Sequence, residues 1–284
     1  PGDVGFPPSG FVDDDADITP PIPPSFPPDL GPDICAEPGY DIHFLFVDDS
    51  VSDSVKSIYR QAADRWEQII VGDVPDVVID LESFSAFGID TLGLPNRDLG
   101  IDDLCVVLQV LEEPGATAQC QPLIFRSHFL HPALATCSFH LENRSDEELY
   151  ALALNQIGRL IGFGSIWPDL ALVTEEPTFL GPETNRRFQQ INRGDATEIP
   201  LVECAPGTYC WDGPFAGSDE VFSAAATSTA SNICPLTVAS FHDLKYAVNF
   251  GAADRCEFPL GVSLPANPNG NLVDAFIPQS AKIR

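Results

Sequence analysis

Eight cysteines, spread from position 35 to position 256, constrain the folding of this chain more than any other feature. None of them forms a CxxC pair, the spacing that is common in zinc sites. An even number of widely spaced cysteines is typical of proteins that fold in an oxidising compartment, so we expect four disulfides. Spacing alone leaves their pairing open. The residues are Cys35, Cys105, Cys120, Cys137, Cys204, Cys210, Cys234 and Cys256.

The balance of charges restricts the partners of the chain. Asp and Glu number 42 against 14 Lys and Arg, which gives a formal net charge of −28. Such a surface repels the phosphates of nucleic acids and of anionic lipids, so we expect no nucleic acid as a partner. No apolar run reaches the roughly 18 residues that a transmembrane helix needs, so we also expect no membrane span.

Further features favour a secreted protein, extracellular or at the cell surface. The sequence begins at Pro1 and contains no Met, as expected of a mature form whose signal peptide has been removed. Asn143-Arg144-Ser145 is a glycosylation sequon, so we expect a glycan on Asn143. Both features agree with the disulfides that the cysteines predict.

Residues 1–34 differ in composition from the rest of the chain. They hold ten Pro and seven Asp but no Lys or Arg. Because Pro lacks the amide donor that helices and inner strands require, we expect an extended arm, up to ~100 Å long at about 3.1 Å per residue. Apolar side chains along it could anchor the arm in grooves of a neighbouring copy. These expected anchors are Phe6, Phe11, Ile18, Ile22 and Phe26.

The folded body, residues 35–284, opens with a strand and an amphipathic helix. Residues 40–47 alternate and then run apolar, which predicts a strand, and Ser50 or Ser52 can cap the helix that follows. We expect two more strands, at residues 77–81 and 105–111. The predicted apolar face of the helix consists of Val51, Val55, Ile58, Ala62, Trp66 and Ile69, at spacings of three and four.

A capping box marks the start of a second long helix. Ser145 can accept from the backbone of Glu148, and Glu148 can reach back to Ser145. Gly162 is placed to end this helix. Further helices are predicted at residues 182–191 and 237–244, within a C-terminal part that is rich in Pro, Gly and Ser.

The second helix carries the segment NQIGRLIG, residues 155–162. Its frame resembles the zinc helix of the leishmanolysin-like metallopeptidases, a branch of the metzincins, which reads H-E-x-x-H-x-x-G. In that motif two His at i and i+4 bind zinc from one helix face, and the Glu acts as general base. Here the two His positions hold Asn155 and Arg159, the Glu position holds Gln156, and Gly162 matches the family Gly.

The resemblance extends over roughly residues 40–255. In this family the third zinc His lies far downstream in an H-W pair, before an E-L-M turn. Cys210-Trp211 resembles that pair and the segment 220–223 resembles that turn, so Cys210 stands in the third ligand position and Phe222 in the Met position. Segments 42–46, 62–76, 179–182 and 236–249 resemble the family's first strand, first helix, post-helix segment and closing segment.

The departures from the family motif argue against zinc chemistry. Amide and guanidinium groups are not zinc ligands, and Gln156 cannot act as a general base. We expect Cys210 to lie in a disulfide, and Arg159 to replace the metal with its own cation, held by nearby carboxylates or carbonyls. The resemblance therefore implies an inactive peptidase frame that needs no cofactor.

Two other cation sites are conceivable but disfavoured. His128 and His131 form an H-x-x-H pair, with His140 and His43 elsewhere, but the segment contains Pro and lacks the helical spacing that such a site needs. The acidic run at residues 13–17 offers carboxylates to calcium, but it lacks the Gly and the Glu of an EF-hand loop. We expect ordinary His residues and a solvated charge run.

The sequence thus predicts an α+β fold: a metzincin-like twisted mixed sheet on two long helices, then a loop-rich, disulfide-bonded C-terminal lobe. The lobes would be residues 35–165 and 166–284, with a cleft beside Asn155 and Arg159. Two functions remain open. One is an inactive structural subunit of an extracellular fibril or surface assembly, whose arm docks on another copy. The other is an extracellular peptide- or glycan-binding module that uses the old substrate cleft.

Overall fold

The computed structural model describes residues 39–46, 51–79, 99–110, 119–140, 144–191, 198–258 and 262–263. All of them lie in the larger of two units of the chain, Pro32–Arg284. The expected arm at residues 1–34, with its anchor side chains and its acidic run, lies outside the described residues, as do Cys35 and Asn143.

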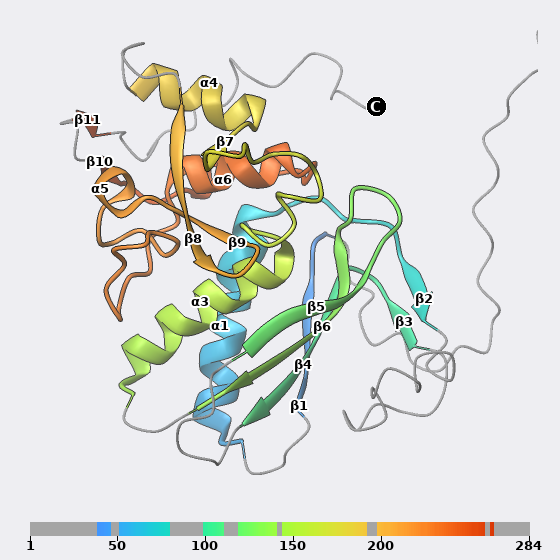
Figure 1. Ribbon diagram of the computed structural model, residues 1–284. Helices are drawn as coiled ribbons and strands as arrows, with labels where there is room; N and C mark the ends of the chain where they lie inside the picture. Colours follow the sequence, from blue (N-terminus) through green and yellow to red (C-terminus); the bar gives the residue numbers. More distant parts are fainter. Residues whose placement is uncertain are drawn as a thin grey trace, which may run out of the picture. The chain divides into compact units, whose positions relative to one another are not determined.

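A four-stranded mixed sheet in the order β1-β4-β6-β5 forms the centre of this unit (Figure 1). Strands β1 (Ile42–Phe46), β4 (Leu104–Val110) and β6 (Pro132–Phe139) run parallel. Strand β5 (Gln119–Phe125) pairs antiparallel with β6 at the edge. Strands β1 and β4 confirm the predictions at residues 40–47 and 105–111, whereas β5 and β6 were not predicted.

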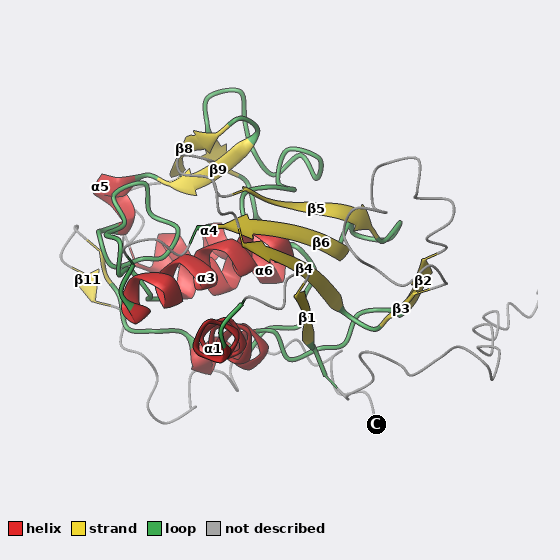
Figure 2. Cartoon of the chain, turned by 90° about the horizontal axis from the view of Figure 1, so that it is seen from below, coloured by secondary structure: helices red, strands yellow, loops and turns green. Residues whose placement is uncertain are grey.

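Two long helices lie against one face of this sheet (Figure 2). Helix α1 (Asp53–Ile69) begins at Ser52, whose hydroxyl accepts from the backbone of Val55. The six residues of its predicted apolar face are all buried, which confirms the helical spacing. The α+β fold predicted from the sequence is confirmed, while its metzincin-like character stays a prediction.

Helix α3 (Asp146–Ile161) begins and ends as its sequence predicts. Both bonds of the capping box are present, from the Glu148 amide to Ser145 Oγ and from the Ser145 amide to Glu148 Oε2. Gly162 caps the C-terminus with φ of 127°, a conformation that favours glycine. The helix therefore has a fixed start and end, which sets the positions of the side chains along it.

The remaining elements are short and lie mostly in the C-terminal half. Helix α4 coincides with its prediction, and α6 begins two residues before the predicted start, at a Pro that suits the first helical turn. Strands β2 and β3 pair with each other, as do β10 and β11, and β7-β8-β9 form a small sheet. The bounds are β2 Val77–Ile79, β3 Leu99–Ile101, β7 Thr178–Phe179, α4 Pro182–Ile191, β8 Ile199–Ala205, β9 Thr208–Trp211, α5 Gly213–Ala216, α6 Pro235–Asp243, the 3-10 helix η3 Phe250–Ala252, β10 Glu257–Phe258 and β11 Val262–Ser263.

One hydrophobic core joins the two predicted lobes. Its centre is aromatic: Phe163 stacks on Phe222 at 3.7 Å between ring centroids, and Trp66 lies 5.9 Å from Phe222 and 5.1 Å from Phe241. These rings come from α1, from the turn after α3, from a loop after α5, and from α6. Burial of such large apolar groups is the main stabilising contribution in a domain of this size.

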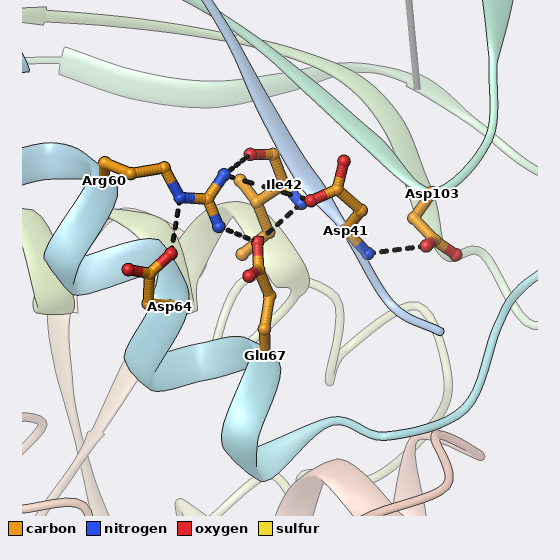
Figure 3. A network of polar contacts seen from close by, with 6 residues as sticks. All are labelled: Asp41, Ile42, Arg60, Asp64, Glu67 and Asp103. Atoms are coloured by element: carbon orange, nitrogen blue, oxygen red, sulfur yellow. Dashed lines mark hydrogen bonds and ion pairs between the residues drawn. The ribbon is translucent and has the colours of Figure 1, made fainter. Parts of the chain in front are cut away.

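A polar network ties α1 to the edge strand β1 (Figure 3). Arg60 donates to Asp64 at 2.6 Å, to the Ile42 carbonyl at 2.8 Å and to Glu67. Glu67 in turn accepts from the Ile42 amide at 3.0 Å. Arg60 and Glu67 therefore each have a partner of opposite charge as well as a backbone partner.

Three disulfides are present among the described residues: Cys120–Cys137, Cys204–Cys210 and Cys234–Cys256. The first joins directly opposed residues of β5 and β6, and the others cross-link the C-terminal part as expected. The expectation that all eight cysteines pair is not met at Cys105. This residue carries a free thiol on β4 and is 1% exposed, in a small apolar cluster with Ile79, Leu99, Ile101, Val107 and Leu134.

Candidate functional site

Helix α3 places Asn155 and Arg159 one turn apart on the same face. Arg159 Nε donates to Asn155 Oδ1 at 3.2 Å. The Asn155 side chain is itself held, because its Nδ2 donates to the Val221 carbonyl at 2.7 Å. The spacing that would present two imidazoles in the peptidase motif here presents an amide bound to a guanidinium.

Strand β9 brings two further groups to the same guanidinium. Arg159 Nη2 lies 2.9 Å from Cys210 Sγ, and Nη1 donates to the Tyr209 carbonyl at 3.4 Å. Gly164, with φ of 69°, makes this approach feasible, because a Cβ there would lie 2.1 Å from the Tyr209 carbonyl oxygen. The Tyr209 amide bonds to the Gly164 carbonyl at 3.1 Å, which fixes β9 on the turn after α3.

The ring of Phe222 completes the site. Its centroid lies 5.6 Å from Arg159 Cζ, within the range of a cation–π contact. Phe222 is held in turn by its stacking on Phe163 and by the bond from the Trp211 amide to its carbonyl, at 3.0 Å. We refer to Asn155, Arg159, Tyr209, Cys210 and Phe222 as the Arg159 site.

The structure thus brings together four of the five positions that the peptidase motif singled out. Gln156 is the fifth, and it lies elsewhere: its Oε1 accepts from the Tyr59 hydroxyl at 2.8 Å in the buried interface of α3 and α1. Arg159 was expected to be held by carboxylates or carbonyls. A carbonyl is present, but no carboxylate contacts Arg159 among the described residues.

The chemistry of these groups does not fit a zinc ion. The candidate ligands are an amide, a guanidinium and a sulfur that is already bonded to Cys204. Zinc requires thiolate, imidazole or carboxylate ligands, and a disulfide sulfur is not a thiolate. Burial lowers the pKa of Arg159 to about 10, so the guanidinium remains protonated at neutral pH and repels a metal cation.

The histidines that were considered as metal ligands have ordinary contacts. His131 is buried, bonds through Nε2 to the Leu244 carbonyl at 2.7 Å and stacks on Tyr246. His128 lies against the ring of Phe129 at 4.0 Å. His43 is half-buried on β1, where desolvation lowers its pKa. Neither group of potential metal ligands among the described residues includes a histidine.

Two other groups of potential ligands were not anticipated. Glu220, Cys234 and Cys256 converge, but the two sulfurs form a disulfide and the carboxylate accepts from the Cys234 amide at 2.8 Å. Asp102 and Asp103 lie close to Asp73. The two carboxylate oxygens of Asp103 already accept from backbone amides, at residues 41 and 74. Burial is the main cause that raises the pKa of both Asp102 and Asp103 to about 7.

A polar pocket of about 520 Å³ lies beside the Cys234–Cys256 disulfide. Neither Asn155 nor Arg159 lines it. Glu220 in its wall is buried, accepts from Thr237 Oγ1 at 2.8 Å, and has its pKa raised to about 7 by burial. The lining consists of Ala216, Gly217, Ser218, Asp219, Glu220, Asn232, Cys234, Arg255 and Cys256.

Sequence reasoning missed the backbone of the Arg159 site. The Tyr209 carbonyl has no signature in the sequence, and Gly164 was one glycine among 21. The one available signal was the position of Gly164 two residues after the helix-ending Gly162. Glu220 was noticed only through the family turn, and nothing in the sequence indicated that it would be buried.

No protein-family model matches the chain, and no curated protein matches it at a significant level. None of the helices in the described part of the chain has the length and apolar character needed to cross a membrane. The resemblance to leishmanolysin-like enzymes therefore rests on the motifs quoted above.

Proposed function

We propose that this chain is a catalytically inactive relative of the leishmanolysin-like metallopeptidases that serves as a structural subunit of an extracellular assembly. One observation carries the first part: the guanidinium of Arg159 lies among the groups that stand at the ligand positions of the peptidase motif, bonded to Asn155 and Cys210. The site binds its own cation, and its sulfur is committed to a disulfide.

The assembly role is supported by the sequence. Three disulfides in the described residues are compatible with a secreted protein, and residues 1–34 have the composition of an extended arm with apolar anchors. An arm that inserts into the next copy in a head-to-tail manner produces an open filament when the symmetry does not close. The partner of the chain would then be another copy of itself.

Both parts can be tested with the purified full chain. We expect no cleavage of unfolded casein at any zinc concentration, and no zinc retained after dialysis. Sedimentation velocity and negative-stain imaging should show filaments for the full chain and monomers for a version that lacks residues 1–34 but unfolds at the same temperature. Zinc-dependent cleavage would overturn the first part, and a full chain that stays monomeric would overturn the second.

The polar pocket favours a second candidate function, an extracellular binding module for a small polar ligand such as a glycan. Hydroxyl, amide, carboxylate and guanidinium groups line it, and groups of this kind orient polar ligands in binding sites. Asn232→Ala and Ser218→Ala should then abolish the binding of a hit from a glycan array. The pocket carries no such function if the array gives no hit.

A further inference from the structure

Arg159 is a partly buried cation with no counter-charge among the described residues. Its acceptors are an amide oxygen, a backbone carbonyl and a disulfide sulfur, all of them formally neutral. Removal of a guanidinium from water is costly unless an anion compensates it. Desolvation, with no opposing charge, lowers the pKa of Arg159 to about 10.

Other cations that are partly buried have carboxylates beside them. Arg60 contacts Asp64 and Glu67 (Figure 3), and Arg65 pairs with Asp254 at 3.0 Å. Arg126, which bonds to backbone carbonyls, lies near enough to Asp103 for that carboxylate to act on its pKa. Arg159 therefore differs from these arginines in lacking an acidic neighbour within the described part of the chain, although the chain as a whole is strongly acidic.

The described contacts leave two N–H groups of the guanidinium for a carboxylate. Five N–H groups are available on an arginine, and the described contacts of Arg159 use one on Nε, one on Nη1 and one on Nη2. One N–H remains on each terminal nitrogen. A carboxylate can accept from both in the paired geometry that makes this interaction strong and directional. The side chain is only partly buried, so a ligand can reach it from solvent.

We propose that Arg159 is a carboxylate-binding site, and that its occupant is an aspartate of residues 13–17 in a second copy of this chain. This inference rests on the proposed assembly function and names its contact. Chains with a net charge of −28 repel one another, and a cation without a described counter-charge offsets this repulsion where an acidic segment of the next copy binds it. Asp13, Asp14, Asp15 and Asp17 form an acidic run in a segment without Lys or Arg.

Binding of a labelled peptide to the full chain tests this site. The peptide comprises residues 9–19, and its binding is measured by fluorescence anisotropy at a protein concentration below that of assembly. We expect binding to the native protein and, with Arg159→Gln, a loss of about tenfold or more in affinity, since hydrogen bonds to charged groups are the strong ones. Arg159→Lys should recover part of it, because a lysine keeps the charge but not the paired geometry.

Two controls separate the site from charge and from folding. Arg144→Gln removes an exposed arginine and should bind the peptide as the native protein does. A peptide with the four Asp replaced by Asn needs no variant protein and should not bind. Equal binding by the Arg159→Gln variant, or by the Asn peptide, would overturn the inference.

The same measurements distinguish the carboxylate site from the assembly function. Filaments formed equally well by Arg159→Gln would leave the assembly function standing and overturn Arg159 as its contact. Arg159-dependent peptide binding by a chain that stays monomeric at all concentrations would support the carboxylate site and overturn assembly. Peptide binding that appears only after residues 1–34 are removed would show that the arm binds the Arg159 site of its own chain. This result would overturn the second copy as the occupant.

Discussion

At the scale of single residues, the chain departs from the peptidase motif while keeping its geometry of side chains on one helix face. Asn155 and Arg159 lie one turn apart on α3, as the two histidines of the motif would, and their chemistry turns that geometry into a hydrogen-bonded pair. On α3, an amide and a guanidinium thus form a hydrogen bond at a spacing at which two imidazoles could bind zinc.

Gly158 packs against two aromatic rings of the core, so a methyl group there should destabilise the protein. A Cβ would lie 2.4 Å from Phe222 Cζ and 2.6 Å from Trp66 Cζ2. We expect Gly158→Ala to lower the free energy of unfolding by about 1–3 kcal/mol, despite the better helix propensity of Ala. Urea unfolding measures this. Gly100→Ala is the matched control, because nothing lies within 4 Å of a Cβ there, and an equal loss in both variants would contradict the packing argument.

Glu220 should make the stability of the protein fall as the pH rises. Burial raises its pKa to about 7, so the folded state prefers the protonated form. Its stabilising contribution is complete below the pKa of the unfolded chain, about 4.3, and is lost as the pH rises through 7. The loss amounts to about 4 kcal/mol at most, since a tenfold change in proton affinity is worth about 1.4 kcal/mol. Asp102 and Asp103 act in the same direction.

The slope of the free energy of unfolding plotted against pH, between pH 4.5 and 8, measures this effect. Glu220→Gln should flatten the slope, whatever constant offset the lost acceptor introduces. Exposed Glu175→Gln removes the same charge without burial and should leave the slope as in the native protein. If both variants have the native slope, Glu220 does not titrate in the way its burial implies.

At the scale of elements, α3 forms where local signals agree. The capping box, the acidic first turn and the terminal Gly162 all act within the helix itself, so its bounds could be predicted from the sequence. Helix α1 and strands β1 and β4 were predictable for the same reason: spacing of apolar residues is a local property. The sequence did not predict strands β5, β6, β8 and β9. These segments are strands because of the strands with which they pair, and pairing is not a local property.

Removal of the N-terminal cap of α3 should lower the free energy of unfolding by the contribution of that one cap. We expect Ser145→Ala to reduce the free energy of unfolding by about 1 kcal/mol, because the Glu148 amide loses its acceptor. Thermal unfolding of the variant and the native protein measures this. Ser54→Ala is the control, since Ser54 is exposed inside the first turn of α1, where Ala is the better helix former. A larger loss with Ser54→Ala than with Ser145→Ala would contradict the role of the cap.

At the scale of the whole molecule, the aromatic core joins segments that are far apart in the chain, whereas the disulfides close loops between cysteines 6 to 22 residues apart. Cys234–Cys256 and Cys204–Cys210 cross-link the loop-rich C-terminal part, while Phe163, Trp66 and Phe222 connect it to the helices under the sheet. Phe163 lies beside the expected boundary between the lobes, and its ring is at the centre of the core. The two lobes expected from the sequence therefore share one core.

The state of Cys105 distinguishes three disulfides from four. Its thiol is buried, and burial raises its pKa to about 12, so it should resist alkylation in the native protein. After denaturation without reductant, we expect peptide mapping by mass spectrometry to find Cys105 alkylated. The reduced, denatured protein, alkylated at every cysteine, provides the reference. An unlabelled Cys105 under non-reducing conditions would restore the expectation of a fourth disulfide.

The sequence alone determined the acidic, cross-linked character of the chain, its two long helices, and the presence of an amide and a guanidinium where a peptidase motif has histidines. These follow from composition and from spacing over a few residues, which act locally. The tertiary structure decided what holds Arg159. The Tyr209 carbonyl, the bonded sulfur of Cys210 and the ring of Phe222 reach it from β9 and the following loop, about 50 to 60 residues downstream along the chain. Contacts between such distant segments depend on how the whole chain packs, so no local pattern could predict them.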